Sequence, residues 1–217
     1  MRGIYEGYGT FAIGHFALGY LTGKGSSRLL KVKLNLPLLL AVSVISDVDL
    51  ILQFVDPTLF MHRGPTHSII TFTVLMVPLF IIYRKRAVPY YAALLSHSLI
   101  GDFFTGGLEL FWPMSQGWFG FENIDVKSLG PVLAELVLFA VTLAIMLRTQ
   151  NLQSLLKPNK YNWLLLIAFG AVLGPMLQVS GNFEGSIPPL LVIPSLFYLV
   201  LFAYSLAVEL LHSRGRG

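Results

Sequence analysis

One heptapeptide carries much of the chemistry that this chain can offer. The stretch His62–Ser68 (HRGPTHS) packs two imidazoles, one guanidinium and two hydroxyls into seven residues. Long apolar stretches lie on both sides of it. Neutral imidazoles bind divalent transition metals, and a guanidinium binds phosphate or carboxylate. The stretch therefore predicts a ligand site beside hydrophobic segments.

Further ionisable residues lie inside apolar stretches or at their ends. They are His15, Asp47, Asp49, His97 and Asp102. An ionisable side chain within a membrane span costs about 2.5–3.5 kcal/mol on insertion scales, so such residues usually mark function. Together with His62 and His67 they form a set of four imidazoles and three carboxylates. The set can serve as a proton relay, as packed polar pairs or as metal ligands.

Mixed His and Asp ligands suit zinc above all, with manganese or iron as alternatives. Seven donors exceed the needs of one tetrahedral ion and suit two ions that share a carboxylate. Asp47 and Asp49 face opposite sides of a regular helix, and His97 and Asp102 lie about 140° apart around one. We therefore expect an irregular backbone there, or members that orient the ligands. Of the two carboxylates we favour Asp49 as a ligand and Asp47 as a shared or supporting group.

Composition indicates an integral membrane protein. Of the 217 residues, 55% are hydrophobic and 12% are charged, and the mean hydropathy is +0.71. Ordinary soluble domains carry about twice that share of charged residues. Because the chain has no cysteine, neither a disulfide framework nor a thiolate metal site is possible. We predict an all-α, polytopic transmembrane helix bundle that forms one compact domain in the inner or plasma membrane.

Seven apolar stretches approach the roughly 20 residues that a membrane-spanning helix needs. They cover Ile4–Thr22, Leu36–Val55, Thr66–Tyr83, Ala87–Phe104, Pro131–Leu147, Tyr161–Val179 and Pro189–Leu211. The first stretch is the weakest, because it contains Glu6 and His15.

Basic residues predict how these spans are oriented. With seven spans, 12 of the 15 Lys and Arg residues fall on one side of the membrane and 3 on the other. Because Lys and Arg concentrate in cytoplasmic loops, we predict an outward N-terminus and a cytoplasmic C-terminus. All candidate ligands except His15 then lie at the outer membrane boundary. The basic residues form no patch interleaved with aromatic side chains, so we expect no nucleic-acid partner.

The chain divides into two functional halves. Residues 1–113 hold the candidate ligands, in spans one to four and the start of an outer loop. Residues 114–217 hold the rest of that loop and the last three spans, which serve as scaffold. The loop Thr105–Gly130 is rich in Phe and Trp. These aromatic side chains form either an interfacial belt, which we favour, or a lid over the site.

The motifs resemble those of a known family. His15, SDVD at Ser46–Asp49, HRGPTHS at His62–Ser68 and SHSLIGD at Ser96–Asp102 follow one another as in the YdjM-like family of membrane-bound metal-dependent hydrolases. The resemblance covers about Phe11 to Pro113. That family is distantly similar to the zinc-dependent phospholipase C superfamily, in which His and Asp bind a cluster of zinc ions. The resemblance implies that the metal ligands are His15, Asp49, His62 or His67, His97 and Asp102. We count both His62 and His67 as candidates and expect one to three ions.

We expect a hydrolase that cleaves a phosphoester bond in a lipid or lipid-linked substrate. A metal pair lowers the pKa of bound water to about 7, which makes hydroxide available. Asp47 would act as general base or orient the water. Arg63 would clamp the phosphate, or else pair with Asp47 or Asp56. Two alternatives stay open, namely a transporter of divalent metals or protons and a membrane scaffold with a structural metal.

Overall fold

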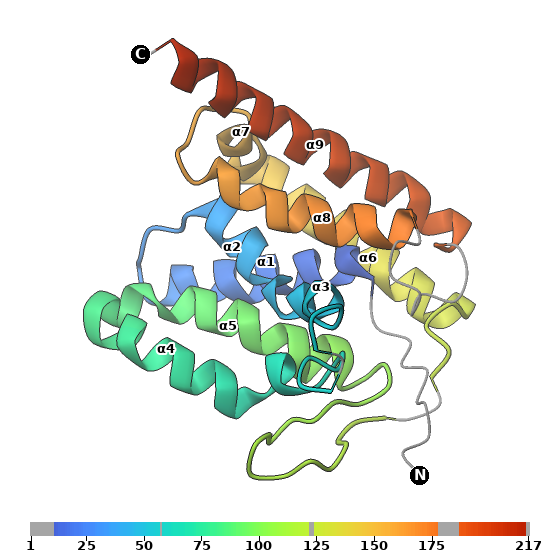
Figure 1. Cartoon of the computed structure of the whole chain (residues 1–217). Coiled ribbons are helices and arrows are strands. Elements are labelled where there is room, and N and C mark those ends of the chain that lie inside the picture. The colour runs from blue at the N-terminus through green and yellow to red at the C-terminus, as the bar shows by residue number, and fades with distance from the viewer. Residues whose placement is uncertain (1–10, 57, 122–123, 178–186, 216–217) are drawn as a thin grey trace.

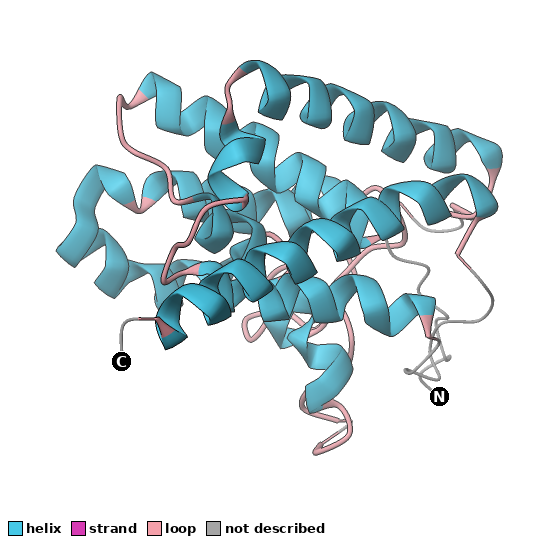
Figure 2. Cartoon of the chain, turned by 90° about the horizontal axis from the view of Figure 1, so that it is seen from above, coloured by secondary structure: helices cyan, strands magenta, loops and turns pink. Residues whose placement is uncertain are grey.

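The described part of the chain is all-helical, as predicted. The computed structural model describes residues 11–56, 58–121, 124–177 and 187–215. The α-helices are α1 (Ala12–Leu29), α2 (Leu36–Val42), α3 (Asp49–Leu52), α4 (Ile69–Tyr83), α5 (Val88–Ser96), α6 (Leu129–Arg148), α7 (Asn151–Leu155), α8 (Leu165–Met176) and α9 (Pro189–Arg214). Short 3-10 helices cover Ile45–Val48, Pro65–His67, Arg84–Arg86 and Asn162–Leu164, and a π-helix covers His97–Asp102. Figure 2 shows these helices joined by loops, with no strand among the described residues.

Helix α1 lies at the centre of the bundle. It contacts α2, α5, α6, α8 and α9. In Figure 1 the α4–α5 hairpin lies on one side of α1, and α8 and α9 lie on the other. The main core joins the first and last helices, because Phe16 of α1 packs against Tyr198 and Phe202 of α9 with ring centroids 5.0 and 5.3 Å apart. The two predicted halves therefore share one core.

Two glycines one turn apart let α2 approach α1 closely. A Cβ atom added to Gly19 would overlap Ser43 Cβ, and one added to Gly23 would overlap Leu39 Cδ1. Small residues at this spacing are typical of closely packed helices in membranes. The approach holds Ser43, which follows α2, against the first half of α1.

Two helices in the described residues are long and apolar enough to cross a membrane. They are α6 and α9, with 20 and 26 residues and a mean hydropathy of 2.2 over their most apolar stretch. A third apolar stretch, Asn162–Met176, is shorter. These three coincide with the last three predicted spans. The structure does not support seven continuous spans, and the inward or outward orientation of the termini stays a prediction.

The first four predicted spans differ from continuous helices for identifiable reasons. Helix α1 begins at Ala12 and ends at Leu29, later than predicted, and residues 4–10 of that span lie outside the described residues. Span Leu36–Val55 breaks into α2, a 3-10 helix and α3, where Ser and Asp side chains compete for backbone hydrogen bonds. Helix α4 has 15 residues because the chain before Ser68 is a 3-10 helix. Span Ala87–Phe104 changes from α to π at His97.

Candidate metal centre

The structure brings together every side chain that the sequence nominates for the site. His15 comes from the first turn of α1, Asp47 from the 3-10 helix Ile45–Val48, Asp49 from the start of α3, His62 and Arg63 from the following loop, His67 from the 3-10 helix before α4, and His97 and Asp102 from the π-helix after α5. A π-helix has more residues in each turn than an α-helix and often occurs at functional sites. It brings residues five apart, such as His97 and Asp102, to one side.

Four of these side chains form a compact cluster of ligand atoms, which we call the quartet. Its atoms are His67 Nε2, His97 Nε2, Asp47 Oδ1 and Asp102 Oδ2. The two nitrogens lie 3.1 Å apart. Asp102 Oδ2 lies 3.2 Å from His67 Nε2 and 3.3 Å from His97 Nε2. Asp47 Oδ1 lies 3.6 and 3.4 Å from the same two nitrogens.

The hydrogen bonds behind the quartet fix which ring nitrogen carries the proton. His97 Nδ1 lies 2.8 Å from the carbonyl oxygen of Ser43, which only accepts, so Nδ1 must donate. His67 Nδ1 lies 3.2 Å from Asp49 Oδ2 and donates to that carboxylate. In the neutral rings both Nε2 atoms then present lone pairs. With both rings neutral, the quartet is four acceptors with no donor between them, and Asp102 Oδ2 has no other hydrogen-bond partner.

A cation among the four acceptor atoms would remove the repulsion between them. Buried charges in proteins are paired or bind metals. An ion about 2.0–2.1 Å from four tetrahedral ligands holds the ligand atoms about 3.3–3.4 Å apart, and the five quartet distances range from 3.1 to 3.6 Å. The three carboxylates outnumber the one guanidinium by two charges, which a divalent ion balances. The quartet can therefore hold a divalent metal ion.

Asp49 lies behind the imidazoles. Its Oδ1 lies 3.0 Å from His62 Nδ1, and its Oδ2 accepts from the Arg63 backbone N–H at 3.2 Å and from Thr66 Oγ1 at 2.7 Å. A carboxylate in this position orients a metal-binding imidazole and increases its basicity. The geometry therefore favours Asp47 as the ligand and Asp49 as the supporting group, the reverse of the assignment favoured from the sequence.

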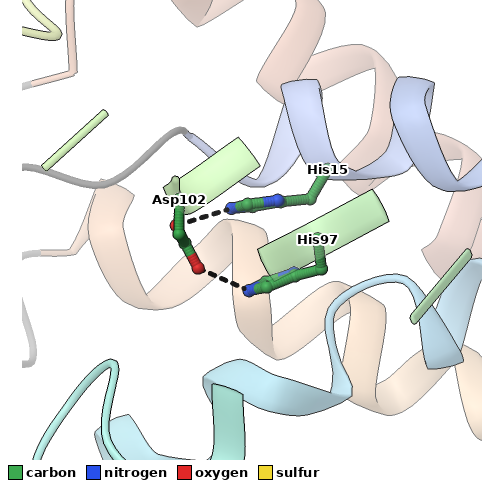
Figure 3. Close-up of side chains that lie close together, drawn as sticks. All are labelled: His15, His97 and Asp102. Atoms are coloured by element: carbon green, nitrogen blue, oxygen red, sulfur yellow. Dashed lines mark ion pairs between the residues drawn. The ribbon is translucent and has the colours of Figure 1, made fainter. Parts of the chain in front are cut away.

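His15 and His62 flank the quartet. The His15 ring stacks on His97, with centroids 3.7 Å apart and an angle of 15° between the ring planes, and His15 Nε2 lies 3.8 Å from Asp102 Oδ1 (Figure 3). The groups His15, His97, Asp102 and Asp47, His62, His67 each place ligand atoms within 4.8 Å of one another. Both histidines are therefore near enough to join a metal centre larger than the quartet.

Arg63 supports Asp102 and the loop that follows it. Its guanidinium donates to Asp102 Oδ1 at 3.1 Å, to the Gly107 carbonyl at 3.2 Å and to Thr105 Oγ1 at 3.2 Å. The side chain is buried, and its backbone has a positive φ of 65°, a conformation that is uncommon for residues other than glycine. The carboxylate partner is therefore Asp102, in place of the predicted Asp47 or Asp56, and the guanidinium holds Asp102 in place.

Two side chains of the cluster are partly exposed in the described part of the chain. Asp47 and His62 are 15% and 20% exposed, whereas His15, Asp49, His67, His97 and Asp102 are buried. The cluster is therefore exposed beside Asp47 and His62, and we call this exposed edge the opening of the site.

Several supporting groups were not predicted from the sequence. The Ser43 carbonyl is a backbone atom, so no side-chain motif marks it. The Thr66 hydroxyl donates a hydrogen bond to Asp49 Oδ2. Ser68 does cap α4, because its Oγ accepts from the backbone N–H groups of Ile70 and Thr71. Glu109 is buried, and its backbone N–H donates to the Arg63 carbonyl.

These features define a helical membrane protein with a buried His and Asp cluster that can bind metal. The chain belongs to the YdjM inner membrane protein family, whose model matches residues 11–183. The matched region contains every residue of the cluster. Membership places the protein in the inner membrane, in contact with the lipid bilayer. No curated protein and no solved structure matches the chain, so the resemblance to the phospholipase C superfamily stays a prediction.

Proposed function

We propose that this protein is a metal-dependent hydrolase that cleaves a phosphoester bond in a lipid or lipid-linked substrate. The observation that carries the proposal is the quartet, in which four acceptor atoms meet at distances that suit a tetrahedral divalent ion and one ligand residue is partly exposed. A structural zinc ion is closed by four protein ligands, whereas a catalytic ion keeps a position for water or takes a fifth ligand. Hydrolysis at the quartet would therefore require the partly exposed Asp47 to yield its position to water, or the ion to bind water beside Asp47 as a fifth ligand.

His67, His97, Asp47 and Asp102 would hold the ion, with zinc favoured and manganese or iron as alternatives. The bound ion would act as a Lewis acid that polarises the phosphoryl group and supplies a nucleophile from water near neutral pH. Asp49 and the Ser43 carbonyl hold the two imidazoles in the tautomer that binds metal. Arg63 fixes Asp102 so that one carboxylate oxygen, Oδ2, lies in the quartet.

His62 would act as the general base that accepts a proton from the attacking water. Its Nδ1 lies 3.0 Å from Asp49 Oδ1, and a carboxylate partner of this kind orients an imidazole that acts as a general base. Nε2 is then the atom that accepts a proton. The partial exposure of His62 supports this role, because a substrate would reach the quartet from the exposed side of the cluster.

The site would lie at the extracytoplasmic boundary of the membrane. Basic residues support this placement, because they occur at the opposite ends of the helices that carry the cluster. His15 lies in the first turn of α1 and Arg28 in its last turn. Arg84–Arg86 joins the far ends of α4 and α5, whereas His67 and His97 lie at their near ends. Basic ends are typically cytoplasmic.

An activity assay on the purified protein tests the proposal. Wild-type protein in detergent is supplied with Zn²⁺ or Mn²⁺ and assayed on a chromogenic phosphodiester and on phospholipids. We expect hydrolysis that a chelator abolishes and that the double variant His67→Ala, His97→Ala lacks, whereas His212→Ala, which changes an exposed histidine at the end of α9, keeps it. Metal-dependent ion uptake into vesicles with no hydrolysis would instead favour the transporter.

A further inference from the structure

Three exposed apolar side chains follow the partly exposed ligand Asp47 along the chain. Ile51, in α3, and Phe54 and Val55, just after α3, lie four, seven and eight residues beyond Asp47. They are 68%, 70% and 79% exposed. The backbone is helical through this segment, with hydrogen bonds from the N–H of Gln53 to the Asp49 carbonyl and from the N–H of Asp56 to the Leu52 carbonyl. We call Ile51, Phe54 and Val55 the apolar stripe.

The π-helix, which is the second segment that carries quartet residues, also has exposed apolar side chains. The π-helix that carries His97 and Asp102 exposes Leu99 and Ile100, and the residue Phe104 just beyond it is also exposed. Both segments therefore present large apolar side chains to the surroundings next to the residues that would bind metal.

Cationic side chains are scarce around the opening. Between Lys33 and Arg84 the sequence has one Lys or Arg, which is Arg63, and residues 87–126 have none. Arg63 is buried and donates to Asp102, Thr105 and Gly107. A soluble phosphorylated substrate is usually recognised by exposed Arg and Lys. The surroundings of this opening are instead suited to hydrocarbon.

We propose that the apolar stripe faces the hydrocarbon of the bilayer and binds the hydrocarbon chain of the substrate, whose phosphorylated headgroup enters laterally beside Asp47 and His62. This inference rests on the proposed function and specifies the route and the substrate class. The substrate is a membrane-resident lipid phosphoester that is selected by its long apolar chain. Ile51, Phe54 and Val55 are then specificity-determining residues that bind no metal.

The position of the stripe can be measured without any activity. Because the chain has no cysteine, Phe54→Cys carries a single nitroxide label in the full-length protein reconstituted in phospholipid vesicles. Val74→Cys, on the exposed apolar face of α4, serves as the lipid reference, and His212→Cys serves as the aqueous reference. We expect the label at residue 54 to collide with oxygen more than with a water-soluble nickel complex, as at residue 74. A label at residue 54 that behaves as at residue 212 overturns the inference.

Delivery of the substrate is tested with two phosphoesters that share one headgroup. One has short chains and is water-soluble, and the other has long acyl chains and is presented in vesicles. We expect the double variant Phe54→Ser, Val55→Ser to lose about tenfold or more in kcat/KM on the long-chain substrate, which corresponds to about 1.4 kcal/mol, and to keep its rate on the short-chain one. The matched control is Val74→Ser, Leu75→Ser, which removes two exposed apolar side chains of α4.

The outcomes separate the inference from the proposed function. Equal rates on the long-chain substrate for the stripe variant and the wild type, or equal losses on both substrates, overturn the inference while hydrolysis stands. A wild type that cleaves neither substrate defeats the proposed function alone, because the accessibility of the label at residue 54 still decides whether the stripe lies in lipid. Unchanged metal content in both double variants verifies that the site is intact.

Discussion

His67 Nε2 and His97 Nε2 lie 3.1 Å apart, although the Nδ1 atom of each ring already faces an acceptor. Two lone pairs at this distance repel unless a cation or a proton lies between them. Two carboxylate oxygens complete the same cluster. This relationship leads us to a metal centre and makes the roles of the neighbouring residues testable.

The supporting role of Asp49 predicts that its substitution weakens metal binding less than substitution of a quartet residue does. We expect Asp49→Asn to weaken metal binding about 10–100-fold, because residues that orient a ligand typically contribute that much. Asp102→Asn, which changes a quartet residue, should weaken binding more. Competition with a chromogenic chelator measures both affinities. Equal affinities in the two variants would contradict the supporting role of Asp49.

Arg63 should stabilise the protein as well as the site. We expect Arg63→Ala to lower the free energy of unfolding by about 3–5 kcal/mol, because loss of the guanidinium leaves Asp102 as an uncompensated buried charge. Thermal unfolding in detergent, compared with the exposed control Arg148→Ala, measures the difference. A phosphate clamp would behave differently, because its removal would reduce hydrolysis and leave stability unchanged.

The close approach of α1 and α2 predicts opposite effects at two glycines of the same helix. We expect Gly19→Ala to destabilise the protein by about 1–3 kcal/mol, because the new methyl group would overlap Ser43 and overpacking costs that much. The Ser43 carbonyl, which accepts from His97, would shift, so metal affinity should fall too.

Gly25→Ala is the control, since nothing lies within 4 Å of its added Cβ. The better helix propensity of alanine should stabilise the helix by about 0.5–1 kcal/mol. Thermal unfolding with the metal content measured in parallel tests both; equal behaviour of the two variants would count against the packing of Ser43 on α1.

The proposed general-base role of His62 predicts that its substitution slows proton transfer without changing metal binding. We expect His62→Gln to lower kcat about 10²–10⁴-fold, the usual contribution of a general acid or base, and to leave the metal content unchanged. Elemental analysis beside the kinetic assay checks both quantities. Loss of metal in this variant would show that His62 is a ligand, as the family resemblance implies.

Much of the site was predictable from the sequence because ionisable residues are rare in apolar segments. His15, His97 and Asp102 stand out for that reason, and the structure brings all three together. Their placement at one level of the membrane stays a prediction. The positions of Asp47 and Asp49 relative to the quartet were not predictable. They depend on the 3-10 helix at Ile45–Val48, and the spacing of two residues gives no sign of that local geometry.

The fold was predictable as a class but not in its detail. High hydropathy indicated helices in a membrane, and the helical class is confirmed, but the count of seven spans assumed that each apolar stretch is one helix. Helix α2 ends at Val42 even though apolar residues continue, because the Ser and Asp side chains that follow compete for backbone hydrogen bonds. The contact between Arg63 and Asp102 depends on a positive φ at Arg63, which no sequence pattern here marks.

Metal stoichiometry tests the central claim most directly. The purified protein is stripped with a chelator, incubated with Zn²⁺ or Mn²⁺, freed of excess metal and analysed by elemental mass spectrometry. We predict at least about one equivalent of metal in the wild type and in His212→Ala, and none in the double variant His67→Ala, His97→Ala. A wild type that is folded and binds no metal, or a double variant that keeps its metal, would contradict the assignment of the quartet as a metal centre.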